Sequence, residues 1–264
     1  YQLINIGWIY GLLGDYEKKE VVENLEKIIN SIQKTALETR NHIYQAQAYI
    51  ISSALRERVL EHNMQTKGLE WSEVEDERRK IVNYSKLALD KLEDIIDPLI
   101  RAEILINSGG NYGKLFMTLT NVEEKRQVLN EAISCLSRAL DELKDLIEPS
   151  LKGRAYVDLG TLYGFLADIT REISKKKECL VKNISNVKDG IEHLKELEDY
   201  TRLGVAYMSL SGAYGRMSEL EENPDIIEML LRKSSSMALR AAELFREKPL
   251  FHTELFGSYS NHLK

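Results

Sequence analysis

One stretch comes close to a catalytic motif: Ser108-Gly109-Gly110-Asn111-Tyr112-Gly113-Lys114, in which glycines precede a lysine as they do in loops that hold phosphate. A phosphate-binding loop also needs a strand before it and a Ser or Thr directly after the lysine. Here Leu115 follows the lysine, the first glycine is misplaced, and no strand pattern precedes the stretch. The sequence therefore predicts no nucleotide site at these residues.

Residues that bind metals or act as nucleophiles are few and scattered. Histidines stand at 42, 62, 193, 252 and 262, and none makes the HxxxH, HExxH or ExxH spacing that puts two ligands on one helix face. Cys135 and Cys179 form no CxxC pair, which favours a reducing compartment, and we expect Cys179 to lie in the core. We predict no catalytic residue, no cofactor and no metal, and therefore no enzyme.

Composition points to a folded, cytoplasmic protein. The 264 residues are 43% hydrophobic and 30% charged, as in ordinary globular domains. No apolar run is long enough for a membrane helix, and the N-terminus shows no signal segment. The net charge of −6, with Lys and Arg interspersed among acids, argues against nucleic acid. The chain begins without Met, and we expect it to be a fragment of a longer protein.

The strongest pattern is an internal repeat of 51 residues. Tyr-Gly pairs at 10, 112, 163 and 214 share one 51-residue grid. The segment 89–98 likewise superposes on 140–149 without a gap. In the second repeat, Glu61 and His62 stand where the Tyr-Gly pair is expected, and we interpret that repeat as degenerate.

Every long segment has helical rather than strand periodicity. We expect a first helix over about 2–14 and a second that carries an apolar face of Val21, Val22, Leu25, Ile28, Ile29 and Ile32. A longer helix follows over about 37–62, with a break at 63–68. Further helices run from Ser72 to Asp97, from Pro98 to about Leu119, and from there to Glu148. Two more pairs follow over about 150–173 and 175–197, with a turn at Lys175–Lys177, and over 200–220 and 225–248. Ser72 and Thr120 each open a predicted capping box, and Asn223-Pro224 is a predicted N-cap followed by an N1 proline.

The repeated glycines fall inside these predicted helices, where each costs roughly 0.8–1 kcal/mol against alanine. We expect close approach of a neighbouring helix to offset that cost. The tyrosine one turn further on would place a large ring beside the small residue, in similar surroundings in each repeat.

Leu159-Gly160-x-x-Tyr163 and the stretch Gly7-Trp8-Ile9-Tyr10-Gly11 resemble the first-helix signature of tetratricopeptide repeats. The period departs from that family, since its unit has about 34 residues. The resemblance implies an all-α solenoid, a right-handed superhelix of about five antiparallel helix pairs whose first helices line the concave face. We predict one domain over 1–264, with repeats at about 1–35, 36–97, 98–148, 149–199 and 200–249 and a partial one at 250–264.

In the family, certain first-helix positions contact the ligand. By that resemblance the partner-binding face would carry Asn5, Trp8, Asn107, Lys114, Asp158, Thr161, Phe165 and Arg216. The alternative is a solvated helix flank that binds nothing. If the face binds a partner, replacing Lys114 and Arg216 by Glu should weaken capture without unfolding the chain.

We therefore predict a non-enzymatic scaffold that binds a protein or peptide in the groove of a helical array. It could also self-associate through uncapped ends. One alternative is the helical sensor arm of a larger signalling ATPase or transcriptional regulator. A less favoured alternative is an all-α enzyme with a pocket inside the superhelix.

Overall fold

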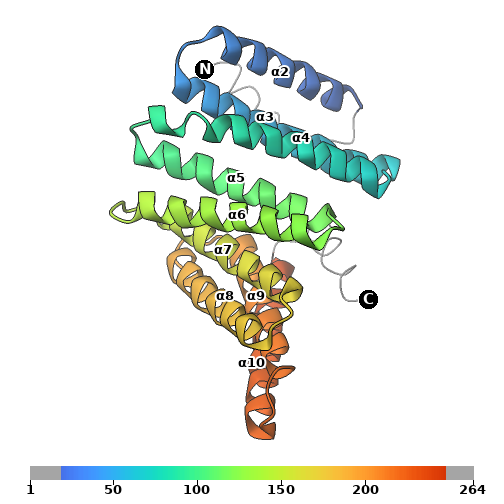
Figure 1. The fold of residues 1–264 in the computed structure, drawn as a ribbon, viewed down its shortest axis with the longest axis vertical. Helices are drawn as coiled ribbons and strands as arrows, with labels where there is room; N and C mark the ends of the chain where they lie inside the picture. The colour runs from blue at the N-terminus through green and yellow to red at the C-terminus, as the bar shows by residue number, and fades with distance from the viewer. Residues whose placement is uncertain (1–18, 248–264) are drawn as a thin grey trace. The chain divides into compact units, whose positions relative to one another are not determined.

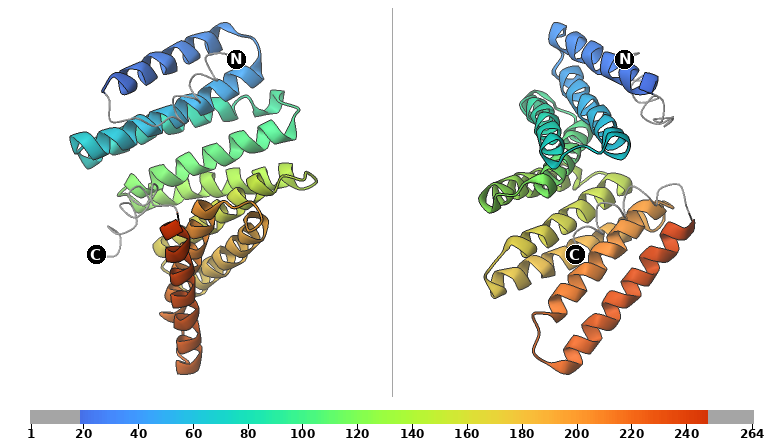
Figure 2. Two further views of the ribbon diagram at one scale, coloured as in Figure 1. Left: turned by 180° about the vertical axis from the view of Figure 1, so that it is seen from behind. Right: turned by 90° about the vertical axis from the view of Figure 1, so that its right-hand side faces the viewer.

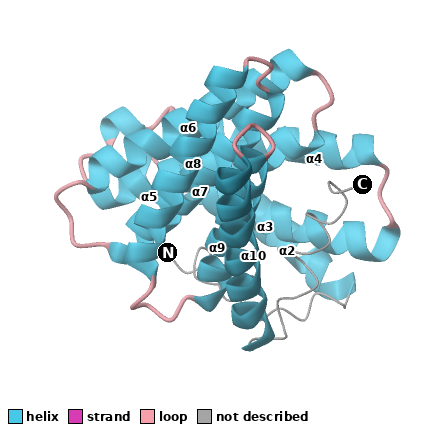
Figure 3. Ribbon diagram, turned by 90° about the horizontal axis from the view of Figure 1, so that it is seen from below, coloured by secondary structure: helices cyan, strands magenta, loops and turns pink. Residues whose placement is uncertain are grey.

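The computed structural model describes residues 19–247, and every regular element among them is helical (Figures 1 and 3). The all-α class predicted from the sequence is confirmed. The helices are α2 (Lys19–Glu38), α3 (His42–Lys67), α4 (Trp71–Leu89), α5 (Pro98–Thr118), α6 (Val122–Leu143), α7 (Pro149–Ile169), α8 (Ile173–Leu194), α9 (Tyr200–Ser218) and α10 (Pro224–Glu247), with a short 3-10 turn, η1 (Leu92–Asp94), after α4. The predicted first helix and the partial last repeat lie outside the described residues.

The chain divides into two compact units, unit 1 up to residue 145 and unit 2 from residue 146. In unit 1, each of the helices α2, α3, α4 and α5 packs against the helix that follows it (Figure 2). In unit 2, α7 packs with α8 and α9 with α10, while α9 also contacts both α7 and α8. Stacking of consecutive helix pairs is the arrangement of an α-solenoid. The right-handed superhelix stays a prediction.

Helix starts recur at a constant interval. We call α3, α5, α7 and α9 first helices, and α4, α6, α8 and α10 second helices. The second helices begin at Trp71, Val122, Ile173 and Pro224, each 51 residues after the last. The first helices α5, α7 and α9 begin at Pro98, Pro149 and Tyr200, again 51 residues apart. The pair α3–α4, which the sequence marks as degenerate, is therefore a complete helix pair.

Small residues face large ones where the two helices of a pair approach each other. A Cβ built on Gly160 of α7 would lie 2.5 Å from Val187 Cγ2 and 2.9 Å from the backbone oxygen of Asn183, both on α8. At Gly109, the equivalent position of α5, it would lie 2.8 Å from Leu136 Cγ on α6. These glycines let the two backbones come together, so close approach offsets their helical cost. The approaching helix belongs to the same pair, not to a neighbouring repeat.

In unit 2, a second glycine of each first helix also faces a large side chain of its partner helix. Gly153 of α7 faces Leu194 of α8, and Gly204 of α9 faces Phe245 of α10. Leu194 and Phe245 are 0% and 5% exposed, so each glycine makes room for a fully buried side chain. Interior side chains pack this densely in most proteins, and an added methyl group would have no space.

The predicted break at 63–68 is wrong, because α3 continues to Lys67. Gly68 ends it in the left-handed region, with φ of 61°, which glycine adopts without strain. The capping box that opens α4 is formed by Glu70 and Glu73, so the predicted cap Ser72 already lies inside the helix. Asn121 rather than Thr120 caps α6, accepting bonds from the backbone N–H of Glu123 and Glu124 at 3.0 Å.

The predicted ends of two second helices, α4 and α6, are also wrong. α4 ends at Leu89 and α6 at Leu143, several residues before the prolines taken as their stops. Pro98 opens α5, as predicted, and Pro149 opens α7 within one residue of the predicted start, because the first turn of a helix tolerates a missing N–H. The predicted turn at 175–177 lies in the first turn of α8. Asn223 accepts a bond from Asp225 N at 3.0 Å ahead of α10, as the predicted cap requires.

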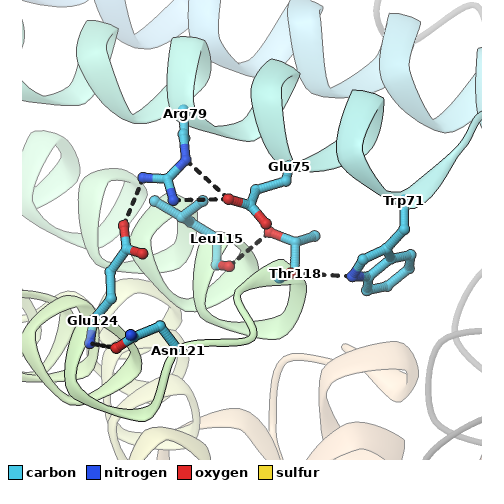
Figure 4. A network of polar contacts seen from close by, with 7 residues as sticks. All are labelled: Trp71, Glu75, Arg79, Leu115, Thr118, Asn121 and Glu124. Atoms are coloured by element: carbon cyan, nitrogen blue, oxygen red, sulfur yellow. Dashed lines mark hydrogen bonds and ion pairs between the residues drawn. The ribbon is translucent and has the colours of Figure 1, made fainter.

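A polar network joins the helix pairs of unit 1 (Figure 4). Arg79 of α4 donates to Glu75 on its own helix at 2.7 Å and to Glu124 of α6 at 2.6 Å. The bond from Arg79 is the main reason why the pKa of the Glu124 carboxyl lies below its ordinary value. Trp71 at the start of α4 donates its indole N–H to the Thr118 carbonyl at the end of α5, at 3.0 Å.

The two cysteines lie at different depths. Cys135, left without a predicted place, is 3% exposed in α6, and burial raises the pKa of its thiol to about 11. Cys179, predicted in the core, is half-buried and packs against the buried cluster of Ala167, Leu180 and Ala213.

Candidate binding surface on the first helices

The predicted binding residues occupy three equivalent positions on successive first helices. We call these positions the first-helix face: Asn107, Gly110 and Lys114 on α5, Asp158, Thr161 and Phe165 on α7, and Ser209, Gly212 and Arg216 on α9. Asn5 and Trp8, also predicted to bind, lie outside the described residues. The face is described within each unit, α5 in unit 1 and α7 with α9 in unit 2.

Lys114 reaches from α5 to α3 in unit 1. Its Nζ lies 3.1 Å from Glu57 Oε1 and 3.7 Å from Glu61 Oε1. Glu57 is 4% exposed, and its oxygens make no hydrogen bond of good geometry, so ion pairs hold its charge. The second ion pair comes from Arg78 of α4, whose Nη2 lies 3.6 Å away. The other Arg78 nitrogen, Nη1, donates to the Lys114 carbonyl at 2.6 Å.

This cluster changes the expected result of the substitution Lys114→Glu. The new carboxylate would stand beside Glu57 and Glu61, and Glu57 is too buried for water to screen the repulsion. We therefore expect Lys114→Glu to destabilise unit 1, contrary to the expectation that it leaves the fold intact. A neutral residue is the better probe of this position.

In unit 2 the face brings α7 and α9 together through hydroxyl groups. Thr161 Oγ1 donates to the Val157 carbonyl at 2.9 Å and lies 3.4 Å from Ser209 Oγ. Ser209 in turn donates to Asn183 Oδ1 of α8 at 3.4 Å. Asn183 is 0% exposed, so this chain of polar groups runs from the interior to the half-buried face.

Arg216 holds α9 to α7, as Lys114 holds α5 to α3. Its Nη1 lies 2.6 Å from both carboxylate oxygens of Asp168 and donates to the Gly164 carbonyl at 3.2 Å. The Asp168 side chain is 44% exposed, so this pair meets solvent. Asp158 lies 3.7 Å from Arg154 of its own helix, and Phe165 is half-buried. In unit 1, Asn107 donates to the Glu103 carbonyl of its own helix at 2.8 Å.

Two glycines of the face have no packing role. A Cβ on Gly110 would meet no atom within 4 Å, and one on Gly212 would meet only Arg216 Nη2, at 3.5 Å. The explanation by close helix approach, which holds for Gly109 and Gly160, therefore fails for these two. Gly110 and Gly212 therefore leave the backbone of α5 and α9 uncovered at equivalent positions. The equivalent position of α7 is occupied by Thr161.

Sequence reasoning missed the partners of the face: Glu57, Arg78, Asp168 and Asn183. One signal was present. Glu61 stands where other repeats carry the Tyr of the Tyr-Gly pair, and an acid at an aromatic position suggests a basic partner nearby. That acid lies beside Lys114. Asp168 and Asn183 give no comparable signal, because polar residues at those positions also fit an exposed flank.

The described residues contain no group of three or more His, Cys, Asp and Glu side chains that could hold a metal. None of the described helices has an apolar stretch sufficient to cross a membrane.

No protein-family model matches the sequence, and the search of curated proteins found no match. A solved structure described as a "Circular tandem repeat protein with novel repeat topology and enhanced subunit contact surfaces" is similar over 93% of this chain, at 17% identity and a TM-score of 0.41. This chain spans 57% of the length of that protein.

Proposed function

We propose that the chain is a non-enzymatic scaffold of the cytoplasm, related in plan to tetratricopeptide repeats with a 51-residue unit, that binds an extended protein segment on the first-helix face. The interval between helix starts supports the repeat unit. The proposed partner is a protein or peptide, not a nucleic acid or a membrane.

The single observation that carries this proposal is the pair of bare glycines. A glycine inside a helix costs roughly 0.8–1 kcal/mol, and neither Gly110 nor Gly212 gains helix packing in return. Close approach of a ligand to the backbone is the remaining structural use of such a position. In unit 1 the amide group of Asn107 stands one turn before Gly110, and in unit 2 the hydroxyl groups of Ser209 and Thr161 lie near Gly212. Groups of this kind suit the peptide groups of an extended segment.

The test is a selection of peptides from a displayed random library on the full chain, followed by anisotropy titration of the enriched peptides. We expect Gly212→Arg, which fills the open backbone, to weaken binding at least about tenfold, or 1.4 kcal/mol. The matched control is Ser185→Arg, which adds the same side chain to an exposed position of α8. Circular dichroism would verify that both variants stay helical.

Gly212→Ala makes the test sharper, because it should stabilise the helix while it weakens binding. Opposite movement of stability and affinity is not the result of general damage to the fold. Enriched peptides that bind Gly212→Arg and the native chain equally would overturn the proposal, as would a selection that enriches none.

A further inference from the structure

A stripe of side chains along α10 is exposed, while the equivalent residues of other second helices are covered by a helix. We call it the α10 stripe: Leu231, Ser235, Ala238 and Ala242. Leu231 is 48% exposed, and the other three residues are exposed as well. Among the described helices, α10 packs on α9, and Phe245 is buried on that side. The stripe contains no residue of the first-helix face, so the proposed function does not use it.

In α8 the equivalent residues, 51 positions earlier, contact the next first helix. These residues are Leu180, Ile184, Val187 and Ile191. Leu180 belongs to a hydrophobic cluster with Ala213 of α9, and the other three belong to a cluster with Leu210 of α9. Leu180 and Val187 are 0% exposed as a result.

Unit 1 uses the same stripe between α4 and α5. Arg78, Val82 and Ser85 of α4 stand at the positions of Leu180, Ile184 and Val187. Arg78 donates to the Lys114 carbonyl of α5 at 2.6 Å, and Ser85 accepts from the Asn111 amide of α5 at 2.9 Å. The stripe is therefore a helix-binding surface in both units, and on α10 the same surface is exposed.

The spacing and the sizes of the α10 stripe indicate how a helix fits it. Its residues recur at intervals of four, three and four, which is the spacing of the seam between two paired helices. Three of its four side chains are small, whereas α8 carries Ile184, Val187 and Ile191 at those positions. The distance between packed helices depends on the side chains at the contact. The α10 stripe therefore allows a second helix to approach more closely than α9 approaches α8.

The α10 stripe is complementary to itself. When two copies of α10 pair antiparallel about a two-fold axis at the centre of the stripe, Leu231 of one copy lies opposite Ala242 of the other. Ser235 of one copy lies opposite Ala238 of the other in the same register. The large side chain of each stripe then meets a small one, which is how helix layers interdigitate.

The residues beside the seam also match between two antiparallel copies. Asp225, Arg232, Leu239 and Arg246 follow one another at intervals of seven, so they flank the stripe on one side. The antiparallel pair brings Asp225 of one copy to within about 3 Å, measured along the helix axis, of Arg246 of the other. Arg232 of one copy meets Leu239 of the other, which is 62% exposed, and its aliphatic stem can cover that apolar side chain. In a parallel pair, Asp225 would face Asp225 and Arg246 would face Arg246.

We propose that α10 binds α10 of a second copy of this chain, antiparallel and through the α10 stripe. The second copy covers on α10 the surface that α9 covers on α8. Small side chains bury little area, and interfaces of small area are at the weak end of specific association. We therefore expect a monomer–dimer equilibrium with a dissociation constant of about 1–100 µM.

The experiment is analytical ultracentrifugation of the full chain over a concentration series. We expect the mass to rise from monomer to dimer and to stop there, because a two-fold interface is closed. Ser235→Lys places two like charges near the two-fold axis and should weaken association at least about tenfold. The neighbouring Ser236 is also exposed but lies off the stripe, so Ser236→Lys is the matched control and should leave dimerisation unchanged.

Three results overturn the proposal. A chain that stays monomeric up to about 1 mM leaves another helix, of this chain or of a different protein, as the occupant of the stripe. Equal dimerisation of Ser235→Lys and Ser236→Lys shows that the copies associate elsewhere. A mass that keeps rising beyond the dimer excludes a two-fold pair. Both serines are exposed, so neither substitution disturbs the core, and circular dichroism verifies that the variants stay helical.

Disulfide formation tests the register. Leu231 and Ala242 lie about 16 Å apart along one helix, too far for a disulfide within one chain. In the double variant Leu231→Cys/Ala242→Cys, each new cysteine faces its counterpart in the other copy, and we expect a covalent dimer on mild oxidation. Each single variant places its two cysteines about 16 Å apart across the dimer and should stay uncrosslinked. Equal cross-linking of a single variant overturns the antiparallel arrangement.

Discussion

Units 1 and 2 place a basic residue at the same position of the first-helix face and use it to reach the preceding first helix. In unit 1, Lys114 pairs with Glu57, which is 4% exposed and is also approached by Arg78. In unit 2, Arg216 makes a two-oxygen pair with Asp168, whose side chain is 44% exposed. One position therefore serves a buried charge cluster in one unit and a solvated pair in the other. The two positions make equivalent contacts, but we expect them to contribute different free energies, because the charge of Glu57 is buried and that of Asp168 is solvated.

The tyrosines of the repeat show a related difference. Lys182 lies over the ring of Tyr163 at 5.5 Å, and Lys233 over that of Tyr214 at 5.7 Å, both in unit 2. In unit 1 the residue equivalent to these lysines is Glu131. Burial, with smaller contributions from Cys135 and Glu131, raises the pKa of Tyr112 to about 12. Tyr112 and Tyr214 are buried and Tyr163 is half-buried, while Tyr10 lies outside the described residues.

The largest expected effect is a difference in stability between variants of Lys114 and of Arg216. Lys114→Met leaves buried Glu57 with Arg78 alone, 3.6 Å away, and should lower the free energy of unfolding of unit 1 by about 3 kcal/mol, the lower end for a broken buried pair. Arg216→Met removes a solvated pair and should cost unit 2 less than about 1 kcal/mol. Hydrogen exchange followed by mass spectrometry under increasing urea reports the stability of each unit separately.

The double variant Glu57→Gln/Lys114→Met is the control for Lys114→Met. It removes both charges and should recover much of the loss, because the cost lies in an uncompensated buried carboxylate. Equal losses for Lys114→Met and Arg216→Met would show that burial does not distinguish the two units in this way.

A second comparison concerns the glycines where the two helices of a pair meet. We expect Gly160→Ala to destabilise unit 2 by about 1–3 kcal/mol, as overpacking does, since the new Cβ would lie 2.9 Å from a backbone oxygen that cannot move alone. Gly109→Ala in unit 1 should cost less, because its nearest neighbour is the flexible side chain of Leu136. Thermal unfolding of both variants measures the difference, and a costlier Gly109→Ala would contradict this reading of the packing.

These glycines also show how far the sequence reaches. The repeat and the helical periodicity predict the all-α class and place most helices, since spacing alone carries both signals. The repeat cannot show which glycines are packed. Gly109 and Gly110 are neighbours in sequence, yet the first faces Leu136 across the pair and the second faces open space. Which of the two glycines is packed depends on how the helix is rotated about its axis. A glycine has no side chain whose polarity would indicate, in the sequence, whether it faces the partner helix or solvent.

The buried charged partner of the face, Glu57, was missed for a different reason. In the sequence, Glu57 is indistinguishable from an exposed helix residue. It is buried between Arg78 and Lys114 only because α4 and α5 pack against α3. Helix ends were misplaced because the prolines at 98 and 149 fit either the end of one helix or the start of the next. Leu92 and Ile95 lie in the non-α segment between α4 and α5 and are buried. Their apolar side chains continue the helical pattern in the sequence, so the pattern does not indicate where α4 ends.

A third prediction reverses the sign of the glycine effect. Gly110→Ala in unit 1 and Gly212→Ala in unit 2 should each raise the free energy of unfolding by about 0.5–1 kcal/mol, because alanine is the better helix former and neither new Cβ meets a close neighbour. Urea unfolding of the two variants beside Gly160→Ala gives the comparison in one assay. Destabilisation by either variant would mean that the face is packed and not open.

The smallest expected effect is the pH dependence that the Arg79–Glu124 pair of unit 1 gives to stability. The bond from Arg79 holds the pKa of Glu124 below its ordinary value, so the folded state binds this proton less readily than the unfolded state. The contribution is therefore complete at pH values above the ordinary carboxyl pKa and is lost as pH falls through the lowered pKa. The side chains are 40% and 35% exposed, which limits it to about 0.5 kcal/mol.

Arg79→Met should remove this contribution at neutral pH and change little at acid pH, so the stability curves of the native chain and the variant should converge on acidification. Unit 2 carries Val181 and Ile226 at the equivalent positions of α8 and α10, and they are 55% and 38% exposed. Because neither side chain titrates, Val181→Met is the matched control and should give a difference from the native chain that does not vary with pH. A constant difference for Arg79→Met as well would place the effect in packing by the arginine stem and not in its charge.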